Sequence, residues 1–417
     1  MKAPLTNPPT SPAGAAASLE LDPVEILQEL IAIPSVNPMG KECSGAEYFE
    51  FGMTSWLVDF FRRLDVEYEV QEVTEGRCNV VARLNADEDA PTIMLDAHQD
   101  TVPVDGMTIA PFAPVIKEGR LYGRGACDVK GGMAAMLTAF ARLATERPAG
   151  RANVIMSCSC DEEFSAQGAR FLAKRWQDAG ATDSLVSSPP DFCVVAEPTD
   201  LNVIVAHRGV VRWKVETRGI ACHSSRPHEG RSAIYDMAQV IQALQRYADD
   251  LPRRVGAHPL CGTPTLSVGR ILGGTSVNIV PEHCEIEIDR RTSPGERADQ
   301  VWKEIDVYLR QETDANFVMQ PPWIDADSLS DETNQAWADR LIRHIQAVSG
   351  PCEKQGAWYC TNASSFDAGG VPSVVYGPGS IAQAHTADEW IEIEQLRQAS
   401  ETYYLFCADP GSPEMPA

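Results

Sequence analysis

Histidine and acidic side chains follow several predicted strands of this 417-residue chain, at the point where each strand ends. In open α/β sheets, ligands bind beyond the carboxyl ends of the strands. We therefore expect six of these side chains to meet at one edge of a sheet. They are His98 after the run TIMLDA, Asp128 in the glycine-rich turn YGRGACDVKGG, Glu162 and Glu163 after ANVIMSCSC, Glu197 after FCVVA, and His385 in the loop after SVVY.

The residue types in this set point to divalent cations. Imidazole nitrogens and carboxylate oxygens, without sulfur, suit Zn²⁺, with Co²⁺ or Mn²⁺ as alternatives, rather than Cu(I) or an iron–sulfur cluster. Two adjacent ions would neutralise buried carboxylates that could not all ionise on their own. Such a pair can activate water and bind both oxygens of a tetrahedral intermediate. The pattern therefore predicts a hydrolytic centre with two divalent ions.

The adjacent acids Glu162 and Glu163 leave two interpretations open. Neighbouring side chains on an extended strand point to opposite faces, but in a turn both can face one site. One could then bind a metal ion while the other accepts a proton from the attacking water. Alternatively, the pair could be an acidic cap that stabilises a helix N-terminus. The motif alone favours neither interpretation.

Alternating strands and helices are expected to position these residues. The periodicity predicts a helix that starts at Pro23 and stops at Pro34, helices at 46–64, 132–145 and 168–179, and strands at 79–84, 92–97, 152–158 and 192–196. This order is typical of an α/β domain with a largely parallel sheet. From 210 to 320 the order becomes β-α-β-β-α-β, an α+β unit of the ferredoxin-like type. Helices at 332–348 and 391–406 and a strand at 373–376 follow. We therefore expect an α/β catalytic domain, 21–209 and 323–417, interrupted by an inserted α+β domain, 210–322.

The charge balance restricts the partners of the chain. Its 59 Asp and Glu residues against 35 Lys and Arg residues give a formal net charge of −24. This argues against nucleic acid or an anionic membrane as partner, because both are polyanions, and no apolar run reaches the roughly 18 residues of a membrane-spanning helix. Residues 1–20 have the composition of a disordered tail and lack the apolar segment of a secretory signal. Twelve scattered cysteines without a C-x-x-C pair favour reduced thiols in a cytoplasmic protein.

Four segments together resemble the M20 family of metallopeptidases and deacylases. DAHQDTVPV, GRGACDVKGG, DEEFSAQGAR and VVAEPT fit the H-x-D-T-V-P, G-x-x-D-x-K-G-G, paired-Glu and E-P-T motifs of the family in order, and the likeness runs from about Pro23 to Phe406. The resemblance implies that Asp128 bridges two metal ions. His98 and Glu197 would complete one site, and Glu163 and His385 the other. It also implies that Glu162 is the general acid/base and that Asp100 orients the imidazole of His98.

The inserted domain resembles the lid and dimerisation domain of this family, which implies a homodimer. Within RGIACHSSRPHEGRSAI, His223 stands where the family has a histidine that reaches a neighbouring active site and stabilises the oxyanion. Asn278 and Arg291 stand at substrate-binding positions, and a guanidinium suits a substrate carboxylate. Thr361 is expected to contact the substrate as well.

The resemblance implies a dinuclear zinc hydrolase that cleaves the amide bond of an N-acyl amino acid. The closing segment YGPGSIAQAHTADEWIEIEQL is most similar to the acetylornithine deacetylase branch, so N-acetyl-L-ornithine, in arginine biosynthesis, is the leading substrate. A dipeptidase, a carboxypeptidase or a deacylase for another N-acyl amino acid is the alternative, whereas a non-catalytic homologue would lack a ligand or the base. One departure concerns the substrate. Asn362 stands where that branch has Glu, which removes a negative charge near the pocket and argues against a cationic side chain.

Overall fold

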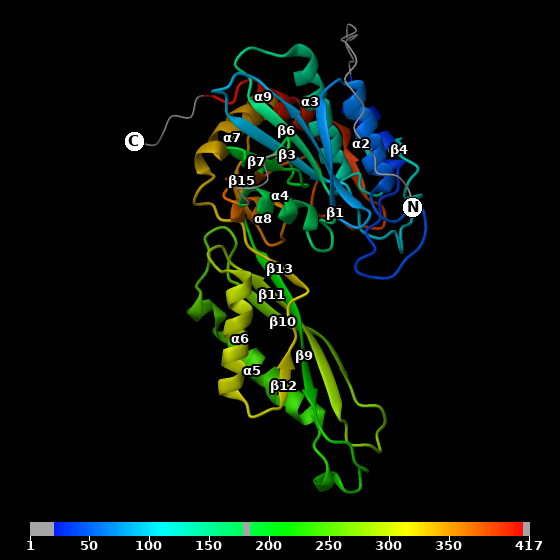
Figure 1. Ribbon diagram of the computed structural model, residues 1–417, viewed down its shortest axis with the longest axis vertical. Coiled ribbons are helices and arrows are strands. Elements are labelled where there is room, and N and C mark those ends of the chain that lie inside the picture. Colours follow the sequence, from blue (N-terminus) through cyan, green and yellow to red (C-terminus); the bar gives the residue numbers. More distant parts are fainter. Residues whose placement is uncertain (1–20, 178–183, 412–417) are drawn as a thin grey trace.

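The computed structural model describes residues 21–177 and 184–411. The tail predicted at 1–20 and the end of the helix predicted at 168–179 lie outside these ranges. The chain forms two bodies, a layered α/β body and, below it in Figure 1, an elongated α+β body. The second body is inserted into the first, because the chain enters it through one strand and leaves it through another.

The α/β body is built on an eight-stranded sheet with the order β1-β2-β6-β3-β7-β15-β8-β14. Its strands are β1 (Glu67–Thr74), β2 (Arg77–Leu84), β3 (Thr92–His98), β6 (Asn153–Ser159), β7 (Phe192–Val195), β8 (Val203–His207), β14 (Lys354–Ala357) and β15 (Ser373–Val375). The central strands β6, β3, β7 and β15 run parallel, whereas β2 and β8 run antiparallel to β6 and β15. The expected parallel arrangement therefore holds for the centre, and the sheet as a whole is mixed.

Helices cover both faces of this sheet, so its central strands are apolar along almost their whole length. Ile93 and Leu95 of β3 face one core and Met94 faces the other. The first core contains side chains of α1 (Pro23–Ile31), α2 (Phe51–Arg63), α3 (Lys130–Glu146), α7 (Gln335–Ser349) and α9 (Ile393–Ala408), and the second those of α4 (Gln167–Gln177) and α8 (Ala363–Ala368). The result is a three-layer α/β/α body.

The α+β body consists of an antiparallel sheet with two helices on one face. Its strands β9 (Gly209–Arg218), β10 (Thr265–Gly273), β11 (His283–Thr292) and β12 (Phe317–Met319) have the order β10-β11-β9-β12. The helices α5 (Ala233–Arg254) and α6 (Ala298–Glu312) pack on this sheet around a separate core. The predicted order β-α-β-β-α-β is confirmed. An additional strand, β13 (Ile324–Ala326), pairs with β9 where the chain returns to the first body.

The sequence prediction failed at short elements and at the edge strand β1, which has eight residues and was not predicted. The strands β8 and β14 were not predicted, because runs of four or five residues carry little periodicity. The helix predicted at 46–64 begins only at Phe51. A small sheet of β4 (Val115–Lys117), β5 (Arg120–Tyr122) and β16 (Trp390–Glu392) and a 3₁₀ turn at Pro227–Glu229 complete the described elements. Among these elements, no helix is long and apolar enough to cross a membrane.

Candidate metal centre and active site

The six predicted side chains meet at the carboxyl edge of the central parallel strands. His98 is the last residue of β3, and Glu197 lies two residues beyond the end of β7. Asp128 lies two residues before the start of α3, and its peptide bond with Val129 is cis. Asp161, with a φ of +62°, turns the chain after β6, so that the following two acids can both face the site. The expectation that these residues converge is therefore met.

Asp128 lies between the two histidines and offers one oxygen to each. Its Oδ1 lies 3.2 Å from Nε2 of His98, and its Oδ2 lies 3.2 Å from Nε2 of His385. On the first side, Oε1 of Glu197 lies 3.9 Å from Nε2 of His98. On the second side, Oε2 of Glu163 lies 3.2 Å from Nε2 of His385. The side chains thus form two adjacent donor sets that share Asp128.

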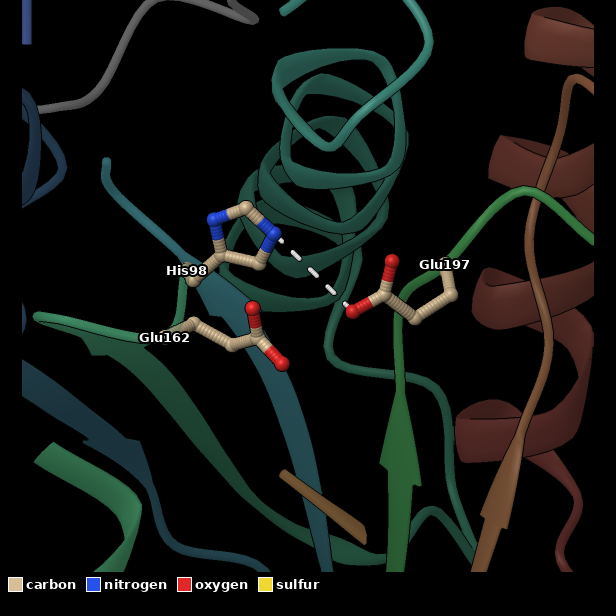
Figure 2. Close-up of side chains that lie close together, drawn as sticks. All are labelled: His98, Glu162 and Glu197. Carbon is tan, nitrogen blue, oxygen red and sulfur yellow. Dashed lines mark ion pairs between the residues drawn. The ribbon is translucent and has the colours of Figure 1, made fainter. Parts of the chain in front are cut away.

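Glu162 lies beside the first donor set. One of its carboxylate oxygens and the donor atoms of His98 and Glu197 lie within 4.8 Å of one another. Figure 2 shows these three side chains facing a common space, with the dashed line marking the pair between His98 and Glu197. Glu162 is therefore close enough either to bind a cation or to accept a proton from a water molecule in this space.

The electrostatics of the site test whether metal ions would fit. Burial raises the pKa of Glu162 to about 8 and that of Glu163 to about 7, and it raises the pKa of Glu197 well above its ordinary value. Burial also opposes ionisation of Asp128, but hydrogen bonds with the two histidines hold its pKa well below the usual range. Oε1 of Glu163 is buried and has no hydrogen-bond partner among the described residues. All four carboxylates can be ionised near neutral pH only beside added positive charge, so the donor sets fit two divalent ions.

Asp100 holds the turn that carries the paired glutamates. Its carboxylate accepts hydrogen bonds from the main-chain N–H groups of Glu162 and Glu163, both at 3.1 Å, and from the side-chain amide of Asn37 at 2.7 Å. Nδ1 of His98 lies 2.9 Å from the main-chain oxygen of Asp100 but 3.6 Å from its carboxylate. The main-chain carbonyl of Asp100 therefore makes the closer contact with His98, while its carboxylate also holds the turn, and the role of that carboxylate in orienting His98 stays a prediction.

A buried ionic network behind this turn was missed by the sequence analysis. Arg77 of β2 forms ion pairs with Glu50 and Asp161, and one further bond joins its Nε to Glu50 at 3.1 Å. Asp161 also accepts hydrogen bonds from Asn37 and Ser165. The network fixes the residue before Glu162. Nothing in the sequence signalled it, because its members lie far apart in the chain.

Glu389 is a second missed residue, and it holds the turn that carries Asp128. Its Oε1 accepts hydrogen bonds from the main-chain N–H groups of Cys127 at 2.8 Å and of Asp128 at 2.9 Å. Its Oε2 accepts from Gly125 N–H at 3.0 Å and pairs with Arg124 at 2.8 Å. The Glu389 carboxylate thus holds the main chain at Asp128, the residue that the two donor sets share. The only available signal was an acidic residue four positions after His385.

A cavity of about 330 Å³ opens beside the donor sets, between the two bodies. Glu162, Glu163 and His385 lie on one side of it, and Arg291 of β11 lies on the side formed by the α+β body. Thr361 also lines the cavity, but its hydroxyl lies 3.1 Å from Nε2 of the buried His207. The structure therefore brings Arg291 and Thr361 to the site, with the Thr361 hydroxyl already engaged.

Asn362 does not face this cavity, which corrects the expectation of a changed charge in the pocket. Its side chain is buried, and its amide nitrogen lies 3.2 Å from Oδ2 of Asp96 and 2.9 Å from the Ser159 hydroxyl. Asp96 also accepts a hydrogen bond from Ser157 at 2.6 Å. Asn362 therefore belongs to a buried polar cluster on strands β3 and β6, below the donor sets.

His223 and Asn278 are not brought to the cavity within one chain. Both are exposed, and they lie together in the α+β body, where Ser224 N–H donates to the main-chain oxygen of Asn278 at 3.0 Å. Nδ1 of His223 lies 2.8 Å from the hydroxyl of Ser225. Neither residue lines the cavity beside Glu162. Within this chain, neither residue therefore takes part in the site as the structure shows it.

Comparison with known proteins agrees with this site. The model of the peptidase family M20/M25/M40 matches residues 94–409. The acetylornithine deacetylase of Proteus mirabilis is 29% identical over 91% of this chain and 94% of its own length. An M20 family metallo-carboxypeptidase from Sulfolobus solfataricus superposes with a TM-score of 0.73 at 19% identity, over 93% of this chain and 98% of the other. A dinuclear metal binding peptidase of the M20 family from Bacillus subtilis gives a TM-score of 0.64 at 17% identity, over 93% and 96%.

The fold, the donor sets and these relatives define the protein as a metal-dependent hydrolase. More particularly, the chain belongs to the peptidase family M20/M25/M40. Membership of this family implies a dinuclear metal site, and the two donor sets that share Asp128 are the candidate for it.

Proposed function

We propose that the protein hydrolyses the amide bond of N-acyl amino acids. The observation that carries this proposal is the pair of donor sets sharing Asp128, with Glu162 beside them on the wall of a cavity of about 330 Å³. This volume suits a small molecule. N-acetyl-L-ornithine is the first substrate to test, because the Proteus mirabilis relative is an acetylornithine deacetylase. Activity on it would place the protein in arginine biosynthesis.

Glu162 is the residue that moves the proton in this proposal. Two divalent ions, one held by His98, Asp128 and Glu197 and one by Asp128, Glu163 and His385, would supply a water of lowered pKa and polarise the substrate carbonyl. Glu162 would accept the proton of the attacking water and return it to the departing amine. Burial raises the pKa of Glu162 to about 8 even beside His98, and the charge of two bound ions would lower it toward neutrality. One carboxyl group can then act first as base and then as acid.

The metal in this proposal is Zn²⁺, with Co²⁺ and Mn²⁺ as alternatives, because all five donors are nitrogen or oxygen. Metal analysis of the purified protein should find two ions per chain. A chelator should abolish activity, and titration with each of the three ions should restore it after two equivalents. Full activity with a single equivalent would contradict the shared role of Asp128.

A panel of acetylated amino acids and dipeptides tests the reaction class. We expect kcat/KM for acetylated amino acids to exceed that for dipeptides that share the same carboxyl-terminal residue. A preference of more than about tenfold for the dipeptides would replace this proposal by a dipeptidase or carboxypeptidase on the same scaffold.

We further propose a homodimer in which His223 serves the active site of the partner. This is supported by its exposed position outside the cavity of its own chain. Glu162→Gln and His223→Ala homodimers, each inactive, should regain activity when mixed under conditions of subunit exchange. About half of the dimers are then hybrids, and one of the two sites in each hybrid has both Glu162 and the histidine of its partner. About a quarter of wild-type activity should therefore return. No recovery despite proven exchange would place His223 outside catalysis.

We also propose a cytoplasmic location. All twelve cysteines are unpaired in the structure, and most of them are buried, which suits a reducing compartment. Thiol titration of freshly purified, denatured protein should detect twelve thiols, and a shortfall that a reductant reverses would count against this location.

A further inference from the structure

Three arginines line the cavity beside the donor sets, and we call them the cationic wall. Arg291 lies on β11, Arg212 on β9 and Arg170 on α4, and all three line the same cavity as Glu162. Their side chains are 28%, 37% and 37% exposed, respectively. The sequence resemblance singled out Arg291 alone, so Arg170 and Arg212 are left without a role by the proposed function.

The carboxylates that pair with this wall do not neutralise it. Asp289 accepts from Nε of Arg212 at 2.7 Å and from Nε of Arg291 at 2.8 Å, so two guanidinium groups share one carboxylate. Arg170 donates one Nη to Asp325 at 2.6 Å. Three cations thus face two anions. Each guanidinium has five N–H donors, so donors are left that can bind a ligand.

The carboxylates that line the cavity are not free to bind the positive charge of a cationic substrate. The carboxylates among its described lining residues are Asp128, Glu162, Glu163 and Glu197. All four belong to the donor sets or carry the proton in the proposed reaction. A substrate ammonium group would therefore find three guanidinium groups and no uncommitted carboxylate. Like charges in a partly desolvated site repel strongly and so select against a substrate.

From this charge distribution we propose that the substrate is an N-acyl amino acid with an acidic side chain. Arg291 and Arg212, which share Asp289, bind one carboxylate, and Arg170 on the neighbouring helix binds the second. A guanidinium binds a carboxylate through paired N–H donors, which gives both affinity and orientation. This assignment rests on the proposed function for the reaction itself and replaces ornithine by an amino acid such as glutamate as the preferred leaving group.

Three acetylated amino acids of similar side-chain length test the assignment. N-acetyl-L-glutamate, N-acetyl-L-glutamine and N-acetyl-L-ornithine differ in side-chain charge, which is −1, 0 and +1. We expect kcat/KM to fall in that order, by about tenfold or more at each step. An ornithine derivative cleaved as well as the glutamate derivative, or a glutamine derivative cleaved better than it, would overturn the proposal.

Substitutions in the wall test which residues discriminate. Arg170→Gln and Arg212→Gln should each lower the ratio of glutamate to glutamine activity by about tenfold. When Arg212 is replaced, Asp289 still pairs with Arg291, so the fold should be kept. The ratio of glutamate to glutamine activity of the folded variant then reports substrate binding and not stability. Arg270→Gln is the matched control, because Arg270 pairs with Glu287 on the same sheet but does not line the cavity. A ratio that stays at the wild-type value in both wall variants would refute the assignment.

The same experiment separates this proposal from the proposed function. Gly-Glu, Gly-Gln and Gly-Orn are assayed beside the acetyl derivatives. Which series is cleaved decides between a deacetylase and a dipeptidase. The order of glutamate, glutamine and ornithine within the cleaved series decides the charge selection, whichever series that is.

Discussion

Replacing Glu389 by glutamine should weaken both the fold and the metal centre. Glu389 and Arg124 are 1% and 2% exposed, and three main-chain N–H groups share the carboxylate with the arginine. Glutamine keeps one acceptor oxygen and replaces the other by an N–H₂ group. Two of the four donors then lose their acceptor.

The size of the effect follows from burial. Removing one partner of a buried ion pair, which here leaves the charge of Arg124 uncompensated, lowers the free energy of unfolding by about 3–5 kcal/mol. A buried N–H group without an acceptor lowers it by about 1–3 kcal/mol. The two losses share one site and are not additive, so we expect a free energy of unfolding lower by about 3–5 kcal/mol. This is a large part of the about 5–15 kcal/mol that stabilises a typical protein. Because Glu389 also fixes Asp128, metal affinity should fall by about 10- to 100-fold.

Glu392→Gln is the matched control for this experiment. Glu392 lies three residues further on and pairs with Arg120 at 2.8 Å, but the two side chains are 37% and 40% exposed. Such a pair contributes at most about 1 kcal/mol. Denaturant unfolding of both variants and metal titration of the folded proteins give the comparison. If the Glu389 variant were within about 1 kcal/mol of the Glu392 variant and bound metal equally well, the role assigned to Glu389 would be wrong.

Three further predictions concern the site and its surroundings. Glu162→Gln should retain two metal ions by elemental analysis and lose about 10²- to 10⁴-fold in kcat; activity within a few fold of wild type would exclude Glu162 as the base. In metal-free protein, burial raises the pKa of Glu162 to about 8 and that of Glu163 to about 7, compared with 4.5 in the unfolded chain. The folded state therefore binds more protons than the unfolded state, so the melting temperature should decrease as the pH is raised from about 5 to about 8. Metal binding needs deprotonated ligands and should oppose this trend, and a metal-free protein that gained stability over the same range would refute the charge argument. Asn362→Glu would place a second carboxylate beside buried Asp96 and should cost about 3 kcal/mol or more of unfolding free energy; Asp96→Ala in the same chain should recover part of that loss, and additive effects would show that the two residues do not interact.

The sequence by itself determined the chemical groups of the site and their approximate place. Five of the six side chains stand just after an apolar strand or in a glycine-rich turn, and His385 stands in the loop that follows such a strand. These positions depend on local periodicity that a sequence displays directly. The order of elements in the inserted body could be predicted for the same reason. Its alternating strands and amphipathic helices are long enough to reveal their periods, whereas β8 and β14 are not.

Only the tertiary structure decided which groups support the site and which way they point. Glu389 reaches the turn of Asp128 from 261 positions away in the chain, and Arg77 reaches Asp161 from 84 positions away. No local pattern encodes such pairs, because they form only when the sheet brings their elements together. The same holds for Asn362, whose neighbour Thr361 lines the cavity while Asn362 itself turns into the buried cluster around Asp96. The direction of a side chain at the start of a short helix such as α8 depends on the residues that pack against it. The sequence gives the identity of that residue but not which residues surround it in the fold.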